Sequence, residues 1–243
     1  MRAEAPSAER VRTLREEILV VLSLSFLASA VYAVLSLLEA PIRGQTVASV
    51  PQDPSLPRQL VGIAFGLAPV WLVLHLLRRG GEGPAAIGLR TDRPGEDAVR
   101  GLVLAAVVGL AGAGLYLAAV ALGVNRAVVP VPPLGHWWTW PVLVLRAAEA
   151  ALTEEIVVLA YLVSRLQRIG WGPWAAVGGS ALLRGAYHLY QGWGGFAGNL
   201  ALGLLFGAGF LRTRRAGPFV VAHFALDVAA GVAFVALRGR LGV

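Results

Sequence analysis

The sequence predicts an all-α polytopic membrane protein, and three observations support this fold class. Hydrophobic residues make up 57% of the 243-residue chain, and the mean hydropathy is +0.68. Only 14% of the residues are charged, against roughly 25% in a soluble domain. The apolar residues also gather in about seven runs, most of them close to the roughly 20 residues that cross a bilayer as a helix. We therefore expect one membrane-embedded domain of about seven transmembrane helices.

The runs predict the helices in order. Residues 1–17 form a charged N-terminal arm, which is followed by apolar spans at 18–38, 60–77, 98–122, 140–166, 174–190, 196–211 and 219–237. The first run is too long for the core of a signal peptide, so we expect an uncleaved helix there. Residues 18–139 then hold the N-terminal helices and their loops, and residues 140–237 hold the helices that carry the candidate catalytic residues.

The positive charge of the chain comes from arginine, because the sequence contains no lysine. The arginines lie between the apolar runs, so we interpret them as loop anchors and expect no nucleic-acid partner. With the N-terminus in the cytoplasm, 14 loop arginines fall on the inner side and 5 on the outer side. This distribution predicts a multi-pass plasma-membrane protein with a cytoplasmic N-terminus. Cysteine is absent, which excludes disulfides, a thiol nucleophile and a cysteine-based metal site.

Three polar groups interrupt the apolar runs of the C-terminal half. The fourth span carries Glu154 and Glu155, and the fifth carries Arg184 and His188. An ionisable side chain costs about 2.5–3.5 kcal/mol at the centre of a membrane helix. Such groups persist when they meet partners, so we expect residues from all three helices to form one site.

The third polar group, His223 and Asp227 of the seventh span, has a spacing of four residues. This spacing places both side chains on one helix face, as it does for Arg184 and His188. Glu154 and Glu155 are neighbours and point about 100° apart. One glutamate can therefore face the site while the other faces a neighbouring helix.

Two imidazoles and a carboxylate from three helices can bind a divalent metal, most simply zinc, and leave a position open for water. The predicted ligands are Glu154, His188 and His223. Metal-bound water is more acidic, and a second carboxylate can accept its proton. The product is a hydroxide that can attack a carbonyl group.

Each residue also has a simpler interpretation. A membrane histidine often serves only as a hydrogen-bonding group between helices, and adjacent glutamates can form an interfacial charge pair. Arg146 and Glu149, three residues apart in the fourth span, are expected to neutralise each other. The residues alone leave a hydrolase and a proton- or ion-coupled transporter open. Transport fits less well, because we find neither an internal repeat nor a pair of proline-broken helices near the site.

The three motifs in this order resemble those of the CPBP intramembrane proteases, the CAAX-processing and bacteriocin-processing group also called Abi proteins. The flanking stretches 180–192 and 194–207 resemble bacterial members of the group. The family pattern is Glu-Glu-x-x-x-Arg, then Phe-x-x-x-His, then His-x-x-x-Asn/Asp. It corresponds here to Glu154-Glu155, to His188, and to His223 with Asp227. The resemblance covers residues 140–237, and the first three spans match only in general style.

The resemblance implies a helical fold around a conical intramembrane cavity. It also implies an endopeptidase that hydrolyses a peptide bond of a membrane-associated protein or peptide, with membrane lipids around it. Glu154, Glu155, His188, His223 and Asp227 would be the catalytic residues. Glu154 would activate the water with His188 beside it, and His223 and Asp227 would bind metal or stabilise the oxyanion. The family mechanism has been interpreted both as glutamate-driven and as metal-dependent.

Two positions depart from the family pattern. The expected arginine is Leu159 here, and the expected phenylalanine is Arg184. We expect Arg184 to play a supporting role and to supply the missing guanidinium from the next helix. The departures also leave open a non-catalytic membrane scaffold or immunity protein.

Overall fold

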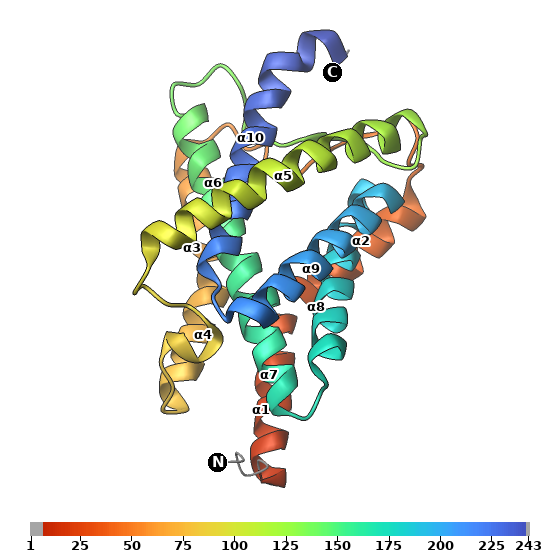
Figure 1. Cartoon of the computed structure of the whole chain (residues 1–243). Coiled ribbons are helices and arrows are strands. Elements are labelled where there is room, and N and C mark those ends of the chain that lie inside the picture. The colour runs from red at the N-terminus through yellow and green to blue at the C-terminus, as the bar shows by residue number, and fades with distance from the viewer. Residues whose placement is uncertain (1–6, 242–243) are drawn as a thin grey trace.

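The computed structural model describes residues 7–241 and consists almost entirely of helices (Figure 1). The helices are α1 (Ala8–Ser23), α2 (Phe26–Glu39), α3 (Leu56–Gly66), α4 (Ala68–Arg79), α5 (Pro94–Ala121), α6 (Thr139–Thr153), the π-helix η2 (Glu154–Tyr161), α7 (Leu162–Arg168), α8 (Pro173–Tyr187), α9 (Trp193–Thr213) and α10 (Gly217–Leu241). Two short 3₁₀ segments are η1 (Pro84–Ile87) and η3 (Leu189–Gln191). Strands β1 (Thr46–Ala48) and β2 (Ala127–Val129) pair in parallel, with Val47 opposite Val128. The predicted all-α fold is confirmed.

The α6–η2–α7 helix runs without a break through the molecule and forms its centre (Figure 1). The predicted span at 140–166 corresponds to it. From Glu155 to Tyr161, every residue of η2 is buried. These residues belong to a core that also includes Val73 of α4, Val177 of α8, Phe206 of α9 and Ala222 of α10. The segment with the two adjacent glutamates is therefore the most enclosed part of the fold.

The predicted count of seven spans is not confirmed. Among the described residues, four helical segments are long and apolar enough to cross a membrane, or five if α1 and α2 form one bent span. The α8 helix has 15 residues, fewer than the roughly 20 that a full crossing needs. It ends at Tyr187, so His188 caps the helix and does not lie within it as predicted.

The first predicted span, 18–38, is bent. The axes of α1 and α2 differ by 50°, and the break lies at Leu24 and Ser25. The Ser25 hydroxyl donates a hydrogen bond of 2.6 Å to the Val21 carbonyl. At its other end α1 begins at Ala8, capped by the Ser7 side chain, so most of the charged segment 1–17 is part of this helix. Residues 1–6 of that segment lie outside the described part.

Helix α5 packs against α10 and holds it in place. Gly101 permits the close approach, because a Cβ atom there would lie 2.6 Å from the Cβ atom of Val221. The loop before α10 is fixed by Arg215, which donates two hydrogen bonds of 2.8 Å to the Asp97 carboxylate and a third, of 2.9 Å, to Asp92. The beginning of α10, which carries His223, is thereby tied to the beginning of α5.

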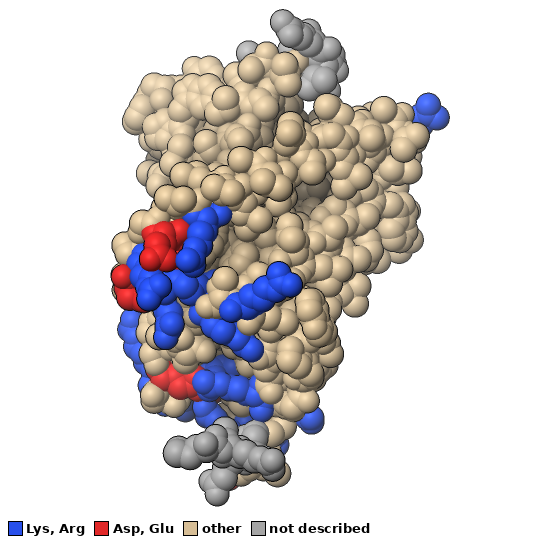
Figure 2. Space-filling model, viewed as in Figure 1, with Lys and Arg blue, Asp and Glu red and all other residues tan. Residues whose placement is uncertain are grey.

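Charged residues are unevenly distributed on the surface. On the face drawn in Figure 2, nearly all of them lie in the lower part of the molecule, near the N-terminus and α4, and the upper part is almost free of charge. Many apolar side chains of α5 are exposed, including Leu102, Val107 and Leu110. This pattern is typical of helices that face lipid, with basic loops gathered on one side of the bilayer.

Candidate active site

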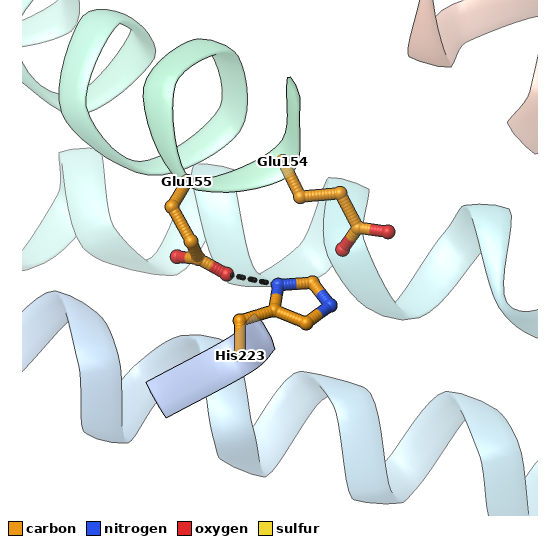
Figure 3. A group of neighbouring side chains, drawn as sticks. All are labelled: Glu154, Glu155 and His223. Carbon is orange, nitrogen blue, oxygen red and sulfur yellow. Dashed lines mark hydrogen bonds and ion pairs between the residues drawn. The ribbon is translucent and has the colours of Figure 1, made fainter. Parts of the chain in front are cut away.

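Residues from η2, the end of α8 and α10 converge in the core of the molecule. Figure 3 shows Glu154 and Glu155 leaving the same helix and extending toward His223 of α10. The backbone hydrogen bonds of a π-helix join residues five apart, whereas those of an α-helix join residues four apart, and short π segments are frequent at functional sites. The β-branched residues Ile156, Val157 and Val158 follow directly and have a lower α-helix propensity. As expected from the sequence, the polar groups of the fourth, fifth and seventh predicted spans lie together in the structure.

Glu155 is the most buried member of the site, with an exposed fraction of 0%. Its Oε1 atom accepts a hydrogen bond of 2.7 Å from Arg184 Nη1 and lies 2.7 Å from His223 Nδ1. The Oε2 atom is buried without a hydrogen-bond partner among the described residues. Arg184 thus makes the contact expected from its position, and it joins α8 to the glutamates.

Glu154 contacts the same arginine from the other side. Its Oε2 atom accepts a hydrogen bond of 2.8 Å from the Tyr187 hydroxyl and lies 3.3 Å from Arg184 Nη2. The expectation that the two glutamates diverge is therefore wrong in part: they contact different helices, but both contact Arg184. Sequence reasoning missed Tyr187, whose one signal is its position directly before His188.

His188 lies at the edge of this group. Its Nε2 atom is 3.8 Å from Glu154 Oε2, and its Nδ1 atom is 3.1 Å from the side-chain nitrogen of Gln191. An amide nitrogen only donates, so Nδ1 accepts and Nε2 carries the proton that faces Glu154. A tilted ring contact with Tyr187, with centroids 4.8 Å apart and an interplanar angle of 42°, also orients the imidazole.

His223 lies between the carboxylates of Glu155 and Asp227, and each of its ring nitrogens faces one of them. The short contact with Glu155 assigns the proton to Nδ1, since a carboxylate only accepts. The other nitrogen, Nε2, lies 3.5 Å from Asp227 Oδ2 on the same helix. The predicted pairing of His223 and Asp227 on one face is confirmed, and Asp227 remains partly exposed at 41% of its side chain.

Glu154, Glu155 and His223 have the donor types and the spacing to hold a metal ion, because one ligand atom from each lies within 4.8 Å of the others. Two of the three predicted ligands are in this group, with Glu155 in place of His188. Carboxylate and imidazole donors suit several divalent metals. The Arg184 guanidinium, however, contacts both carboxylates and the histidine.

Two cavities approach the site along α2. One, of about 490 Å³, lies where both α1–α2 and α3–α4 are interrupted, and it reaches Thr153 next to Glu154. The other, of about 390 Å³, is bordered by Tyr187 and Tyr190. Ser29 of α2 borders both cavities, so both lie along the same face of this helix.

A buried arginine outside the predicted site fixes the turn after His188. Arg126 is 2% exposed and donates hydrogen bonds of 2.8 Å to the carbonyls of Tyr190, Ser36 and Ala40. Its backbone N–H donates to the Gln191 carbonyl. Sequence reasoning treats this residue as a loop anchor, and only the fold reveals that it connects α2 to the histidine turn.

The predicted Arg146–Glu149 pair is confirmed, with a separation of 3.3 Å. Arg146 also donates to the side-chain and backbone oxygens of Gln59 on α3. Gly62 and Gly66 of α3 make room for it, because Cβ atoms there would overlap Arg146 and Glu149. The pair serves helix packing between α3 and α6.

Comparison with known proteins supports the family resemblance. Residues 136–229 match the family model described as type II CAAX prenyl endopeptidase Rce1-like. No curated protein and no solved structure matches the chain. The matched segment contains η2, α8 and α10 as far as residue 229, and so carries all three polar groups. Over residues 136–229, about two fifths of its length, the chain is therefore similar to the Rce1-like type II CAAX prenyl endopeptidases.

Proposed function

We propose that the protein is an intramembrane endopeptidase of the plasma membrane that hydrolyses a peptide bond of a membrane-associated protein or peptide. The observation that carries the proposal is the convergence of Glu154 and Glu155 from η2, Arg184 from α8 and His223 from α10 in one buried hydrogen-bonded group. Membrane-embedded ionisable groups are expensive and are retained for function. The family match adds the reaction class.

In this proposal Glu154 is the general base. It takes a proton from a water molecule while the water oxygen bonds to the carbonyl carbon of the substrate. The carbonyl oxygen becomes an oxyanion, for which the Nε2–H of His188 and the Arg184 guanidinium are the nearby donors. Glu154 then returns the proton to the amine as the C–N bond breaks. The products are a new carboxylate end and a new amino end.

Glu155 and Asp227 have positioning roles in the proposal. Glu155 holds Arg184 and the Nδ1–H of His223, and Asp227 faces the second nitrogen of His223. A divalent metal such as zinc, held by Glu154, Glu155 and His223, would acidify a bound water molecule. His188, which the sequence predicts as a ligand, would then act beside the metal.

A peptidase assay with two matched substrates tests the proposal. Purified protein is incubated with a peptide ending in a CAAX sequence, either farnesylated or unmodified, and the products are identified by mass spectrometry. Cleavage at one defined bond supports the endopeptidase, and the ratio of the two rates decides whether a prenyl group is recognised. Cleavage should fall in His188→Ala and His223→Ala but not in Glu96→Gln, which changes an exposed residue of α5.

A non-catalytic scaffold or immunity-type protein is the second candidate, favoured by the departures at Leu159 and Arg184. It predicts no site-dependent cleavage: either no product forms, or any cleavage is the same in the wild type and in the variants at Glu154, His188 and His223. A proton-coupled transporter is a third candidate that no contact in the site favours.

A further inference from the structure

Arg184 contacts every member of the group that has the donors for a metal ion. Its guanidinium nitrogens lie 2.7 Å from Glu155 Oε1, 3.3 Å from Glu154 Oε2 and 3.2 Å from His223 Nδ1. The residue itself is 2% exposed. Part of the positive charge that these two adjacent carboxylates, one buried and one largely enclosed, require is therefore already supplied by the chain.

The surrounding helices hold this guanidinium in place. Phe206 of α9 lies against it, with the ring centroid 5.6 Å from Arg184 Cζ. Gly203, one turn earlier, leaves room for the arginine side chain, since a Cβ atom there would lie 3.3 Å from Arg184 Cδ. Packing, a cation–π contact and ion pairs thus all favour the same position.

A divalent metal held by these three residues would have to share them with Arg184, which already contacts one ligand group of each. Metal ligands must offer free lone pairs and be deprotonated, whereas Oε1 of Glu155 accepts from Arg184 and His223 Nδ1 is directed at Glu155. A second cation would also lie close to the guanidinium in a medium that screens charge poorly. The two cations are therefore competitors for one set of ligands.

We infer that Arg184 is the resident cation of the site and that it excludes a divalent metal from Glu154, Glu155 and His223. This inference deepens the proposed function by assigning water activation to Glu154 alone, and it departs from the zinc that the sequence predicts. It also gives a reason for the simultaneous presence of Leu159 and Arg184: the guanidinium comes from α8 and reaches between the two carboxylates.

Zinc binding tests the inference without reference to activity. Purified wild type, Arg184→Gln and Arg184→Lys are titrated with zinc, and retained metal is measured by mass spectrometry after gel filtration. The wild type and Arg184→Lys should retain little zinc. Arg184→Gln should bind zinc at least about tenfold more tightly, because one competing charge is gone. Adding His223→Ala to Arg184→Gln should abolish the gain, which separates this site from surface histidines.

Two results overturn the inference. One is near-stoichiometric zinc in the wild type that is lost in His223→Ala, a measurement that requires no change at Arg184. The other is an Arg184→Gln protein that elutes as the wild type does and gains no zinc. If Arg184→Gln does not fold, the wild-type measurement decides alone: little retained zinc supports the inference, and stoichiometric zinc overturns it. None of these readouts is peptide cleavage. The inference can therefore fail while the proposed peptidase activity is confirmed, and the peptidase activity can fail while the inference is confirmed.

Discussion

Tyr187 shows how a single hydroxyl group can position the proposed base. Its oxygen donates a hydrogen bond of 2.8 Å to Glu154 Oε2, and its ring packs between Phe26 and His188. A hydrogen bond to a charged group contributes about 1.5–3 kcal/mol. The bond fixes Oε2 of Glu154 and thereby limits the rotation of its carboxylate.

Tyr187→Phe should therefore lower kcat for peptide cleavage by about tenfold, with a smaller change in KM, since about 1.4 kcal/mol corresponds to a factor of ten. Tyr161→Phe is the matched control, because the Tyr161 hydroxyl is equally buried but has no hydrogen-bond partner among the described residues. It should cleave at the wild-type rate. Equal rates in both variants would contradict the positioning role of Tyr187.

At the scale of elements, the Arg126 contacts join three segments that are distant in sequence: the end of α2, the strand β2 and the turn after His188. Arg126→Leu would leave the carbonyls of Ser36, Ala40 and Tyr190 without their donor. Each buried group left unpaired costs about 1–3 kcal/mol. We expect the free energy of unfolding to fall by at least about 3 kcal/mol, measured by denaturant titration in detergent.

The control for this prediction is Arg58→Leu, because the Arg58 side chain is 78% exposed. It should change the free energy of unfolding by less than about 0.5 kcal/mol. Arg126→Lys should behave much like Arg126→Leu, since a compact ammonium group cannot reach the same set of acceptors. A loss below about 1 kcal/mol for Arg126→Leu would show that water replaces the arginine contacts.

The stability of a second contact between elements, the ion pairs of Glu82, depends on pH. Glu82, in the loop after α4, accepts from Arg165 at 3.0 Å and contacts Arg168 and Arg10. Burial raises its pKa, but the hydrogen bonds from Arg168 and Arg165 outweigh burial and hold the pKa below the ordinary value of 4.5. The stabilisation is therefore present above pH 4.5 and is lost as the pH falls through the lowered pKa.

Glu82→Gln should lower the free energy of unfolding by about 2 kcal/mol at neutral pH. The difference from the wild type should vanish at a pH below the pKa of Glu82 in the folded protein, where the carboxyl group is protonated. Denaturant titrations across this range measure it. Glu96→Gln, in an exposed pair with Arg100, should have almost no effect at any pH. If Glu82→Gln lowered the free energy of unfolding by the same amount at every pH, the stabilisation would not come from the ionised carboxylate of Glu82.

For the whole molecule, the distribution of arginine predicts that the N-terminus lies in the cytoplasm. Because the chain has no cysteine, single cysteines can report the topology without background. Arg58→Cys should react with a membrane-impermeant maleimide in intact cells, and Arg93→Cys should react only after lysis. Both side chains are more than half exposed. If Arg93→Cys reacted in intact cells and Arg58→Cys only after lysis, the N-terminus would lie on the outer side of the membrane.

Much of the architecture could be predicted from the sequence, because a bilayer requires long apolar helices and makes isolated charges expensive. Those two requirements located most helices and predicted that Glu155, Arg184 and His223 would meet. They did not reveal the π-helix, which depends on backbone geometry. Arg126 was missed because a loop arginine has the same sequence signal whether it is exposed or buried.

The helix boundaries at the site also could not be predicted from the sequence. The apolar run continues past Tyr187, and only the structure shows that α8 stops there and that His188 caps it. In the same way, the spacing of Glu154 and Glu155 predicted divergence, whereas Arg184 is long enough to reach both. A long charged side chain can join groups that helix geometry alone would separate.

The central claim is that Glu154 activates the water in a site formed by η2, α8 and α10. The most direct measurement is the rate of peptide-bond cleavage by Glu154→Gln beside the wild type, in preparations with the same gel-filtration profile. The glutamine keeps the shape of the side chain and cannot take up the proton. We expect the rate to fall by more than about 10²-fold. A rate within about threefold of the wild type, far above that expectation, would contradict the claim.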